Sequence, residues 1–168
     1  ALLHILAMGY ELGIDISMED FEKYAKEIRC IVGVIPSGPY TINDLYHAGG
    51  ALAVMKMLES KLFLDVPTMT GTTWGELLKH VHAKSSDLLR SLDNPLYDLP
   101  GLQILRGNLA PNGAIIRPTG VPEEMRVFRG KAKCFDNDTK AYNAIVAGEI
   151  VPGDVIVMRY EGCKGAPG

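Results

Sequence analysis

The chain ends on the run Val155-Ile156-Val157-Met158-Arg159-Tyr160-Glu161-Gly162-Cys163-Lys164-Gly165-Ala166-Pro167-Gly168. Its four leading residues are apolar, and a short apolar run next to turn residues predicts a buried strand. The charged loop that follows is rich in glycine, which lets a backbone approach a ligand closely. In α/β and β proteins, a strand that leads into such a loop commonly presents polar groups at the mouth of a pocket.

The sequence before this strand has the pattern of further strands and one helix. Residues 138–147 carry small and apolar side chains at helical spacing, and Gly148 is expected to end that helix. Pro152-Gly153 predicts a tight turn into the last strand. Short apolar pieces between turn residues predict strands at residues 102–105, 114–116, 126–128, 132–135 and 155–158. Strands of this length and spacing favour a sheet or barrel.

The first half of the chain, residues 1–82, has the periodicity of a helical layer. A first helix is expected from residue 2 to residue 12, with Gly13 as its C-terminal cap, and Ser17 is the expected N-cap of the second. A third helix is interrupted by Gly49-Gly50. The expected N-caps of the later helices, each with an acid at capping-box spacing, are Thr41 with Asp44, and Thr72 or Thr73 with Glu76.

These two sequence patterns predict an α+β protein, in which a helical layer is followed by a β-rich part. The change falls near residues 83–100, around Asp93-Asn94-Pro95. We therefore expect two domains, residues 1–90 and residues 91–168. The second of these is expected to be truncated.

Composition excludes several classes of protein. A formal net charge of −3 over 168 residues offers no electrostatic footprint for nucleic acid or an anionic membrane. No apolar run reaches the ~18 residues that a transmembrane helix needs. Hydrophobic residues make up 47% of the chain, enough to fill a core. The chain begins at Ala1, inside an apolar helical pattern, so we expect an internal fragment of a longer protein.

The cysteines are three in number and widely spaced, at Cys30, Cys134 and Cys163. An odd count argues against a disulfide framework, and no Cys or His spacing suggests zinc. A reducing cytoplasm is the expected location. Cys134 lies inside an apolar strand pattern and is expected to be buried and inert, and Cys30 is expected to be a core or surface thiol without a chemical role.

Polar residues beside glycines are the best candidates for a site. The pocket-adjacent candidates are His47, Asn108, Glu161 and Lys164, with Arg159 beside the last two. His47 precedes the double glycine and Asn108 lies in a glycine-bounded loop. A carboxylate and an ammonium on a glycine loop suit an anionic substrate or a divalent cation. Alternatives stay open: close helix packing at Gly49-Gly50, a hairpin turn at Asn112-Gly113 and a solvated final loop.

Other polar residues favour structural interpretations. His80 and His82 face different sides of a helix and cannot form an i, i+4 metal pair, and His4 lies on an apolar face. Asp93 and Asp98 could do acid–base work, although Asp-Asn-Pro is also a common start of a turn.

Four stretches together resemble the dihydroxy-acid dehydratase/6-phosphogluconate dehydratase family. They are Asp44-Leu45-Tyr46-His47-Ala48-Gly49-Gly50, Asp93-Asn94-Pro95-Leu96, Gly107-Asn108-Leu109-Ala110-Pro111 with Gly113-Ala114, and residues 153–168 from Gly153-Asp154-Val155 to Pro167-Gly168. They occur in family order and cover nearly the whole chain. Leu109-Ala110-Pro111 resembles the dihydroxy-acid branch rather than the sugar-acid branches.

The resemblance implies a hydro-lyase that removes water from a 2,3-dihydroxy acid to give a 2-oxo acid, in branched-chain amino-acid biosynthesis. It implies an iron–sulfur cluster and a magnesium ion whose ligands lie outside this sequence, and a β-rich swivelling C-terminal domain. It also implies a homodimer, cytoplasmic or organellar, with a small dihydroxy-acid substrate. No catalytic residue or metal ligand is expected within the chain, so the fragment alone is expected to be inactive. The alternatives are an aldonate or 6-phosphogluconate dehydratase, or a non-catalytic scaffold module.

The sequence also departs from the family pattern. Cys163 stands where the family usually has proline, and Ala166 where it usually has glycine. The three cysteines match no cluster-ligand motif, so the resemblance gives them no ligand role.

Overall fold

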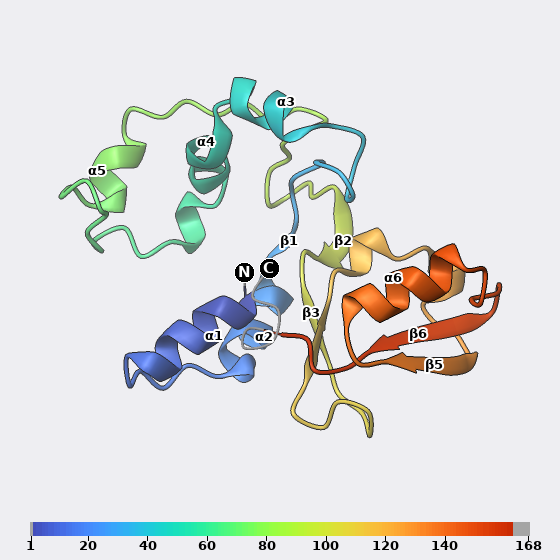
Figure 1. Ribbon diagram of the computed structural model, residues 1–168. Helices are drawn as coiled ribbons and strands as arrows, with labels where there is room; N and C mark the ends of the chain where they lie inside the picture. The colour runs from blue at the N-terminus through green and yellow to red at the C-terminus, as the bar shows by residue number, and fades with distance from the viewer. Residues whose placement is uncertain (1, 163–168) are drawn as a thin grey trace. The chain divides into compact units, whose positions relative to one another are not determined.

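A computed structural model describes residues 2–162 and divides them into two compact units (Figure 1). One unit is Met18–Val121, and the other combines residues 2–17 with residues 122–162. Both contain helices and short strands, so the coarse prediction of a mixed α+β protein is confirmed. None of the helices in the described ranges is long and apolar enough to cross a membrane.

The unit Met18–Val121 holds most of the helices. They are α2 (Met18–Glu27), α3 (Ile42–His47), α4 (Gly50–Met57) and α5 (Trp74–Leu78), with short 3-10 turns at Glu59–Lys61 and Pro118–Gly120. Two of these helices begin with the predicted capping boxes, at Thr41 with Asp44 and at Thr73 with Glu76. Thr73, rather than Thr72, is therefore the N-cap of α5. The predicted interruption at Gly49-Gly50 is confirmed, since Gly49 has φ 103° and separates α3 from α4.

The strands of this unit form two small antiparallel sheets. β1 (Arg29–Cys30) pairs with β2 (Tyr97–Pro100) across a register shift. β3 (Gln103–Leu105) pairs with β4 (Ala114–Ile116) as a hairpin, with Ile104 opposite Ile115. The core centres on Ile31, Ala53 and Leu89, against which pack Val32, Val54, Met57, Leu58, Ala83 and Leu92.

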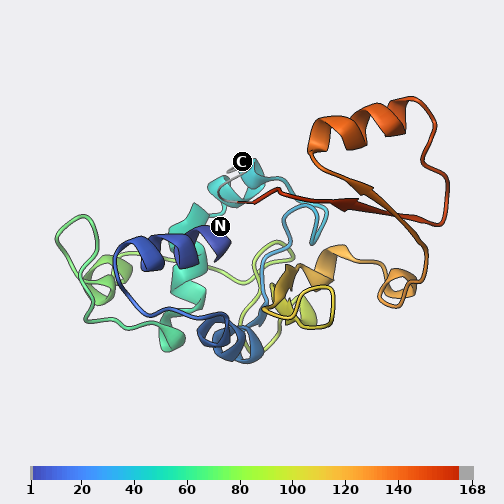
Figure 2. The same ribbon diagram turned by 60° about the horizontal axis from the view of Figure 1, so that its bottom comes forward.

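The second unit contains a β-α-β arrangement. β5 (Lys131–Phe135) and β6 (Asp154–Met158) run parallel, and α6 (Asp138–Val146) connects them and lies over one face of the pair (Figures 1 and 2). The same unit includes α1 (Leu2–Glu11) and a 3-10 turn at Glu123–Met125. Parallel strands need a crossover of this kind, because a short turn cannot return the chain to the same end of the sheet.

The predicted helix ends in this unit are also confirmed. Gly148 has φ 72°, which a residue with a Cβ rarely adopts, and its N–H donates to the carbonyl of Ile145 at 3.0 Å. The N–H of Glu149 donates to the carbonyl of Ala144 at 2.9 Å, which completes a Schellman motif. Gly13 ends α1 with the same pair of hydrogen bonds, from Gly13 to Tyr10 and from Ile14 to Gly9.

One predicted strand was wrong, and two strands were not predicted. Residues 126–128 form no strand, and Val127 is 92% exposed, because the chain leaves a 3-10 turn there and finds no pairing partner. β1 and β2 were not predicted, and β1 interrupts the expected helical layer of residues 1–82. β1 is too short to show a periodic pattern, while β2 contains Asp98 and Pro100, both of types that are depleted in strands.

Candidate functional site

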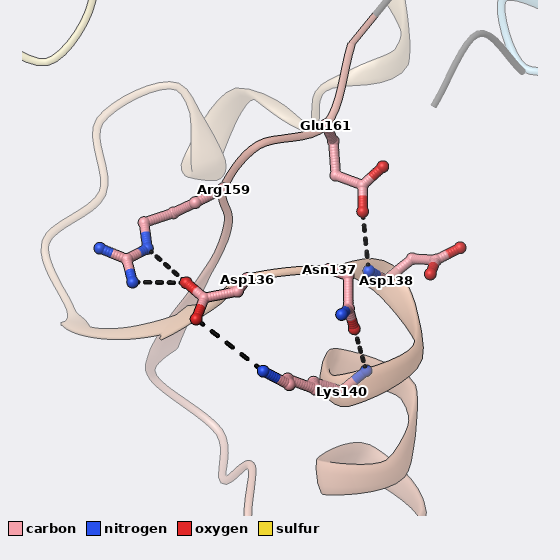
Figure 3. Close-up of polar contacts among 6 residues, drawn as sticks. All are labelled: Asp136, Asn137, Asp138, Lys140, Arg159 and Glu161. Carbon is pink, nitrogen blue, oxygen red and sulfur yellow. Dashed lines mark hydrogen bonds and ion pairs between the residues drawn. The ribbon is translucent and has the colours of Figure 1, made fainter. Parts of the chain in front are cut away.

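Polar side chains follow both parallel strands at the edge where β5 and β6 end (Figure 3). Asp136, Asn137 and Asp138 come directly after β5, and Arg159 and Glu161 come after β6. The carboxyl ends of parallel strands are where α/β sheets commonly bind ligands. The predicted residues Arg159 and Glu161 therefore lie on the edge of the sheet where function is most often found.

Arg159 joins the two strand ends. Its backbone N–H donates to the carbonyl of Phe135 at 2.7 Å, so the ladder between the strands extends past β6. Its guanidinium donates to Asp136 Oδ1 through Nε at 3.0 Å and also through Nη2. The hydrogen bonds to Asp136 raise the pKa of Arg159 above its ordinary value. Because the Arg159 side chain is 50% exposed, water screens this pair, and its main effect is to fix the geometry of the strand ends.

The N-terminus of α6 is capped from two directions. Asn137 Oδ1 accepts a hydrogen bond from the N–H of Lys140 at 2.8 Å, as an N-cap residue does. Glu161 Oε1 accepts a hydrogen bond from the N–H of Asp138 at 3.0 Å (Figure 3). Tyr160, with φ 61°, lies in a bend just before Glu161. The carboxylate satisfies a free N–H and favours the positive end of the helix dipole.

The opposite end of the strand pair is held by Asp154. Its Oδ2 accepts a hydrogen bond from the N–H of Val151 at 3.0 Å and lies 3.0 Å from Lys133 Nζ. Lys133 Nζ also donates to the carbonyl of Glu149. The Val151 N–H and then the Lys133 ammonium hold the pKa of Asp154 below its ordinary value. This ion pair fixes the start of β6, on the far side from Glu161.

The remaining site candidates are placed as follows. His47 is exposed at the end of α3, where its ring and that of Tyr46 form a T-shaped pair at a centroid distance of 5.5 Å. Asn108 is exposed in the loop between β3 and β4. Among residues 2–162, no hydrogen bond or ion pair joins His47 to Asn108. Lys164 lies outside the described residues, so its role stays a prediction.

Among residues 2–162, no hydrogen bond or ion pair joins Asp93 to Asp98, the two aspartates considered for acid–base work. Asp98 Oδ1 lies 3.2 Å from Arg29 Nε. The N–H of Asn94 donates to the carbonyl of Ser91 at 3.2 Å, which forms a turn next to Asp93. The alternative interpretation of Asp-Asn-Pro as a turn is the one that fits.

Asp136, Asn137 and Asp138 were not predicted as part of the candidate site. Three short polar residues between an apolar strand and a helical pattern form a signal that could have identified them, because such residues cap helices. Asp136 is the partner of Arg159, and Asn137 is the N-cap of α6. The N–H of Asp138 donates the hydrogen bond that Glu161 accepts.

Within residues 2–162, no three His, Cys, Asp or Glu side chains lie close enough together to hold a metal ion. Cys30 is half-buried, and its thiol lies 3.6 Å from the carbonyl of Val32. Cys134 is exposed on β5, so the expectation that this thiol is buried was wrong. The described part of the chain thus presents capped helix ends and paired charges rather than a ligand cluster.

Two family descriptions match the chain, one on each side of residues 78–86. "Dihydroxy-acid/6-phosphogluconate dehydratase N-terminal" matches residues 1–77, and "Dihydroxy-acid/6-phosphogluconate dehydratase C-terminal" matches residues 87–168. The chain belongs to the dihydroxy-acid/6-phosphogluconate dehydratase family.

Individual relatives give the same result. A protein of Pyrococcus furiosus named dihydroxy-acid dehydratase is 44% identical over 170 aligned positions, which cover 99% of this chain and 30% of the relative. Proteins of the same name from Ignicoccus hospitalis and Geobacter sulfurreducens are 42% and 41% identical, covering 100% and 99% of this chain. The chain spans about 30% of the length of the curated relatives it matches.

Proposed function

We propose that the protein to which this chain belongs is a dihydroxy-acid dehydratase, which converts 2,3-dihydroxy-3-methyl acids into 2-oxo acids. The observation that carries this proposal is the 41–44% identity, over essentially the whole chain, to relatives that bear that name. In the reaction, the proton on C2 and the hydroxyl on C3 leave as water. The enol that remains rearranges to the 2-oxo acid.

The loop between β3 and β4 supports the dihydroxy-acid substrate over a sugar acid. It contains Leu109-Ala110-Pro111, the run that resembles the dihydroxy-acid branch, and the Leu109 side chain is 86% exposed. A 6-phosphogluconate or aldonate dehydratase is the competing assignment within the family.

An iron–sulfur cluster and a magnesium ion are proposed for the whole protein, on the strength of the family resemblance alone. Such metal centres polarise the leaving hydroxyl and hold the carboxylate of a substrate. The residues described do not fit either group, because residues 2–162 contain no cluster of three candidate ligands. On the family resemblance, the ligands are assigned to parts of the protein outside this sequence.

The finer architecture is proposed in the same way. Residues 1–90 are the end of the N-terminal domain, and residues 91–168 begin a β-rich swivelling domain. The protein is a homodimer in the cytoplasm, or in an organelle if its source is eukaryotic. The two family matches, to residues 1–77 and to residues 87–168, support a domain change between them.

The test is an assay of the complete gene product, prepared without oxygen, with three substrates supplied separately. We expect 2,3-dihydroxy-3-methylbutanoate to yield a 2-oxo acid, detected as its hydrazone, at least tenfold faster than 6-phosphogluconate or gluconate. A preference for either sugar acid would replace the proposal with the competing assignment. No turnover of any of them, in protein shown by iron and sulfide analysis to carry its cluster, would favour a non-catalytic scaffold.

A further inference from the structure

An arginine ties the loop between β3 and β4, residues 106–113, to helix α2. Arg106 directly follows β3, and its guanidinium donates through Nη1 to Glu22 Oε2 at 2.8 Å and through Nη2 to Glu19 Oε1 at 2.6 Å. These contacts join parts of the chain that lie 84 and 87 residues apart. The Arg106 side chain is 39% exposed, so the two ion pairs add little to stability. Because a guanidinium is a rigid planar fork, their main effect is to fix the direction of the side chain and of the loop that carries it.

The other end of the loop lies against the same helix. Gly113, the last residue before β4, has φ 101°. A Cβ built on Gly113 would lie 3.3 Å from Cε of Met18, the first residue of α2. Glycine therefore permits both the left-handed conformation and the close approach of the loop to α2. Both ends of the loop are thus held against the N-terminal half of one helix.

Between these two anchors the loop closes on itself. The N–H of Ala110 donates to the carbonyl of Gly107 at 3.1 Å, and the N–H of Gly107 donates to the carbonyl of Ala110 at 3.4 Å. The carbonyl of Ala110 also accepts the N–H of Gly113 at 3.1 Å. Asn108 and Leu109 are the central residues of this closed turn. The position of the turn therefore depends on the anchors at the two ends of the loop.

We propose that Arg106 is a positioning residue for substrate binding. It fixes the place of the turn that carries Asn108 and Leu109, and this turn contacts the substrate. The inference rests on the proposed function, in which the same loop carries the run that resembles the dihydroxy-acid branch. Binding residues are found disproportionately on loops that a rigid scaffold positions. Arg106 itself touches no substrate and acts through the backbone of Gly107.

The test is steady-state kinetics of the complete protein, prepared without oxygen, with 2,3-dihydroxy-3-methylbutanoate. Arg106→Gln should raise KM about tenfold and leave kcat within about twofold, because a displaced binding loop loses contacts that the ground state and the transition state share. Arg106→Lys should raise KM less, since an ammonium is a single point charge and replaces the fork only in part. Lys26→Gln is the matched control. It removes the other cation on Glu22, at 3.0 Å, without any link to the loop, and should leave KM unchanged.

Hydrogen–deuterium exchange of residues 107–113 measures the anchor without any substrate. We expect faster exchange there in Arg106→Gln than in the parent protein or in Lys26→Gln. Unchanged exchange would show that Arg106 does not hold the loop, and would overturn the proposal. Faster exchange with an unchanged KM would overturn it as well, because the loop would then make no contact with the substrate.

The same variants separate this inference from the proposed function. Partial unfolding of Arg106→Gln would lower kcat and leave KM unchanged, so a fall in kcat alone would contradict a positioning role. A parent protein that prefers gluconate would contradict the proposed function only. The KM of gluconate would then test Arg106 in the same way, and a rise in Arg106→Gln but not in Lys26→Gln would support the positioning role.

Discussion

Glu161, beyond the end of β6, accepts a hydrogen bond through Oε1 from the N–H of Asp138, the first residue of α6, at 3.0 Å. The two residues are linked across the crossover, so the exit of one strand stabilises the helix that connects it to the other. A carboxylate first proposed as a pocket group thus has a structural task in the described part of the chain. Any further role of Glu161 has to be compatible with that hydrogen bond.

Replacing Glu161 tests the strength of this cap. Glu161→Ala should lower the free energy of unfolding by about 0.5–1 kcal/mol, since it leaves an N–H of the first helical turn without its acceptor. Glu161→Gln keeps an acceptor and loses only the charge, so its effect should be smaller. Urea denaturation measures both variants, and faster amide exchange at Asp138 in Glu161→Ala would locate the change. Equal stabilities of Glu161→Ala and the parent protein would refute the cap.

We expect the protonation of Asp154 to lower the free energy of unfolding in acid. Its pKa is lowered from an ordinary 3.8 by the N–H of Val151 and then by Lys133. A lowered folded-state pKa means that the unfolded chain binds the proton first as pH falls. This stabilising contribution is therefore complete above the ordinary pKa and is lost as pH falls from 3.8 through the lowered value.

The measurement is the free energy of unfolding between pH 7 and pH 2.5, in the parent protein and in Asp154→Asn. We expect the variant to be less stable at neutral pH and to show a shallower loss below pH 4. Asp65→Asn, at an exposed aspartate, is the matched control and should follow the parent curve. Parallel curves for Asp154→Asn and the parent protein would show that Asp154 does not contribute to the acid dependence.

We expect Thr73 to contribute more to the free energy of unfolding than its neighbour Thr72. Thr73 Oγ1 accepts from the N–H of Glu76 at 3.2 Å, and Glu76 Oε2 accepts from the N–H of Thr73 at 3.0 Å. Thr73→Ala removes one half of this box and should cost about 1 kcal/mol of unfolding free energy. Thr72→Ala keeps the box and should cost less. Thermal denaturation measures the stability of both variants. Equal losses of stability in Thr73→Ala and Thr72→Ala would mean that the capping box does not stabilise α5.

Local features of the fold could be predicted from the sequence because their causes lie within a few residues. The boxes at Thr41 and Thr73 and the helix end at Gly148 depend on hydrogen bonds that span three to five residues. The tight turn at Pro152-Gly153 is of the same kind, with Gly153 at φ 96° and the N–H of Asp154 bonded to the carbonyl of Val151 at 3.1 Å. Each of these residues has a conformational preference that needs no distant partner.

Pairings between distant segments could not be predicted in this way. Cys30 lies opposite Tyr97 in the β1–β2 pair, and nothing near either residue indicates the other. The same holds at the candidate site, where Arg159 and Glu161 were expected to be polar groups but their partners Asp136 and Asp138 were not. Those contacts require the parallel pairing of β5 and β6, which places the two strand ends side by side. Side-chain chemistry alone does not determine such pairings.

The core of the unit Met18–Val121 gives the last prediction. Leu89 is 1% exposed and packs with Ile31 and Ala53, so Leu89→Ala would leave a cavity and should lower the free energy of unfolding by about 2–5 kcal/mol. Leu109→Ala is the matched control, because the same atoms are removed from an exposed side chain, and it should change stability by less than about 0.5 kcal/mol. Urea denaturation separates the two. A comparable loss of unfolding free energy in both variants would mean that Leu109 is covered in the complete protein. No loss in Leu89→Ala would contradict the packing of Leu89 in this core.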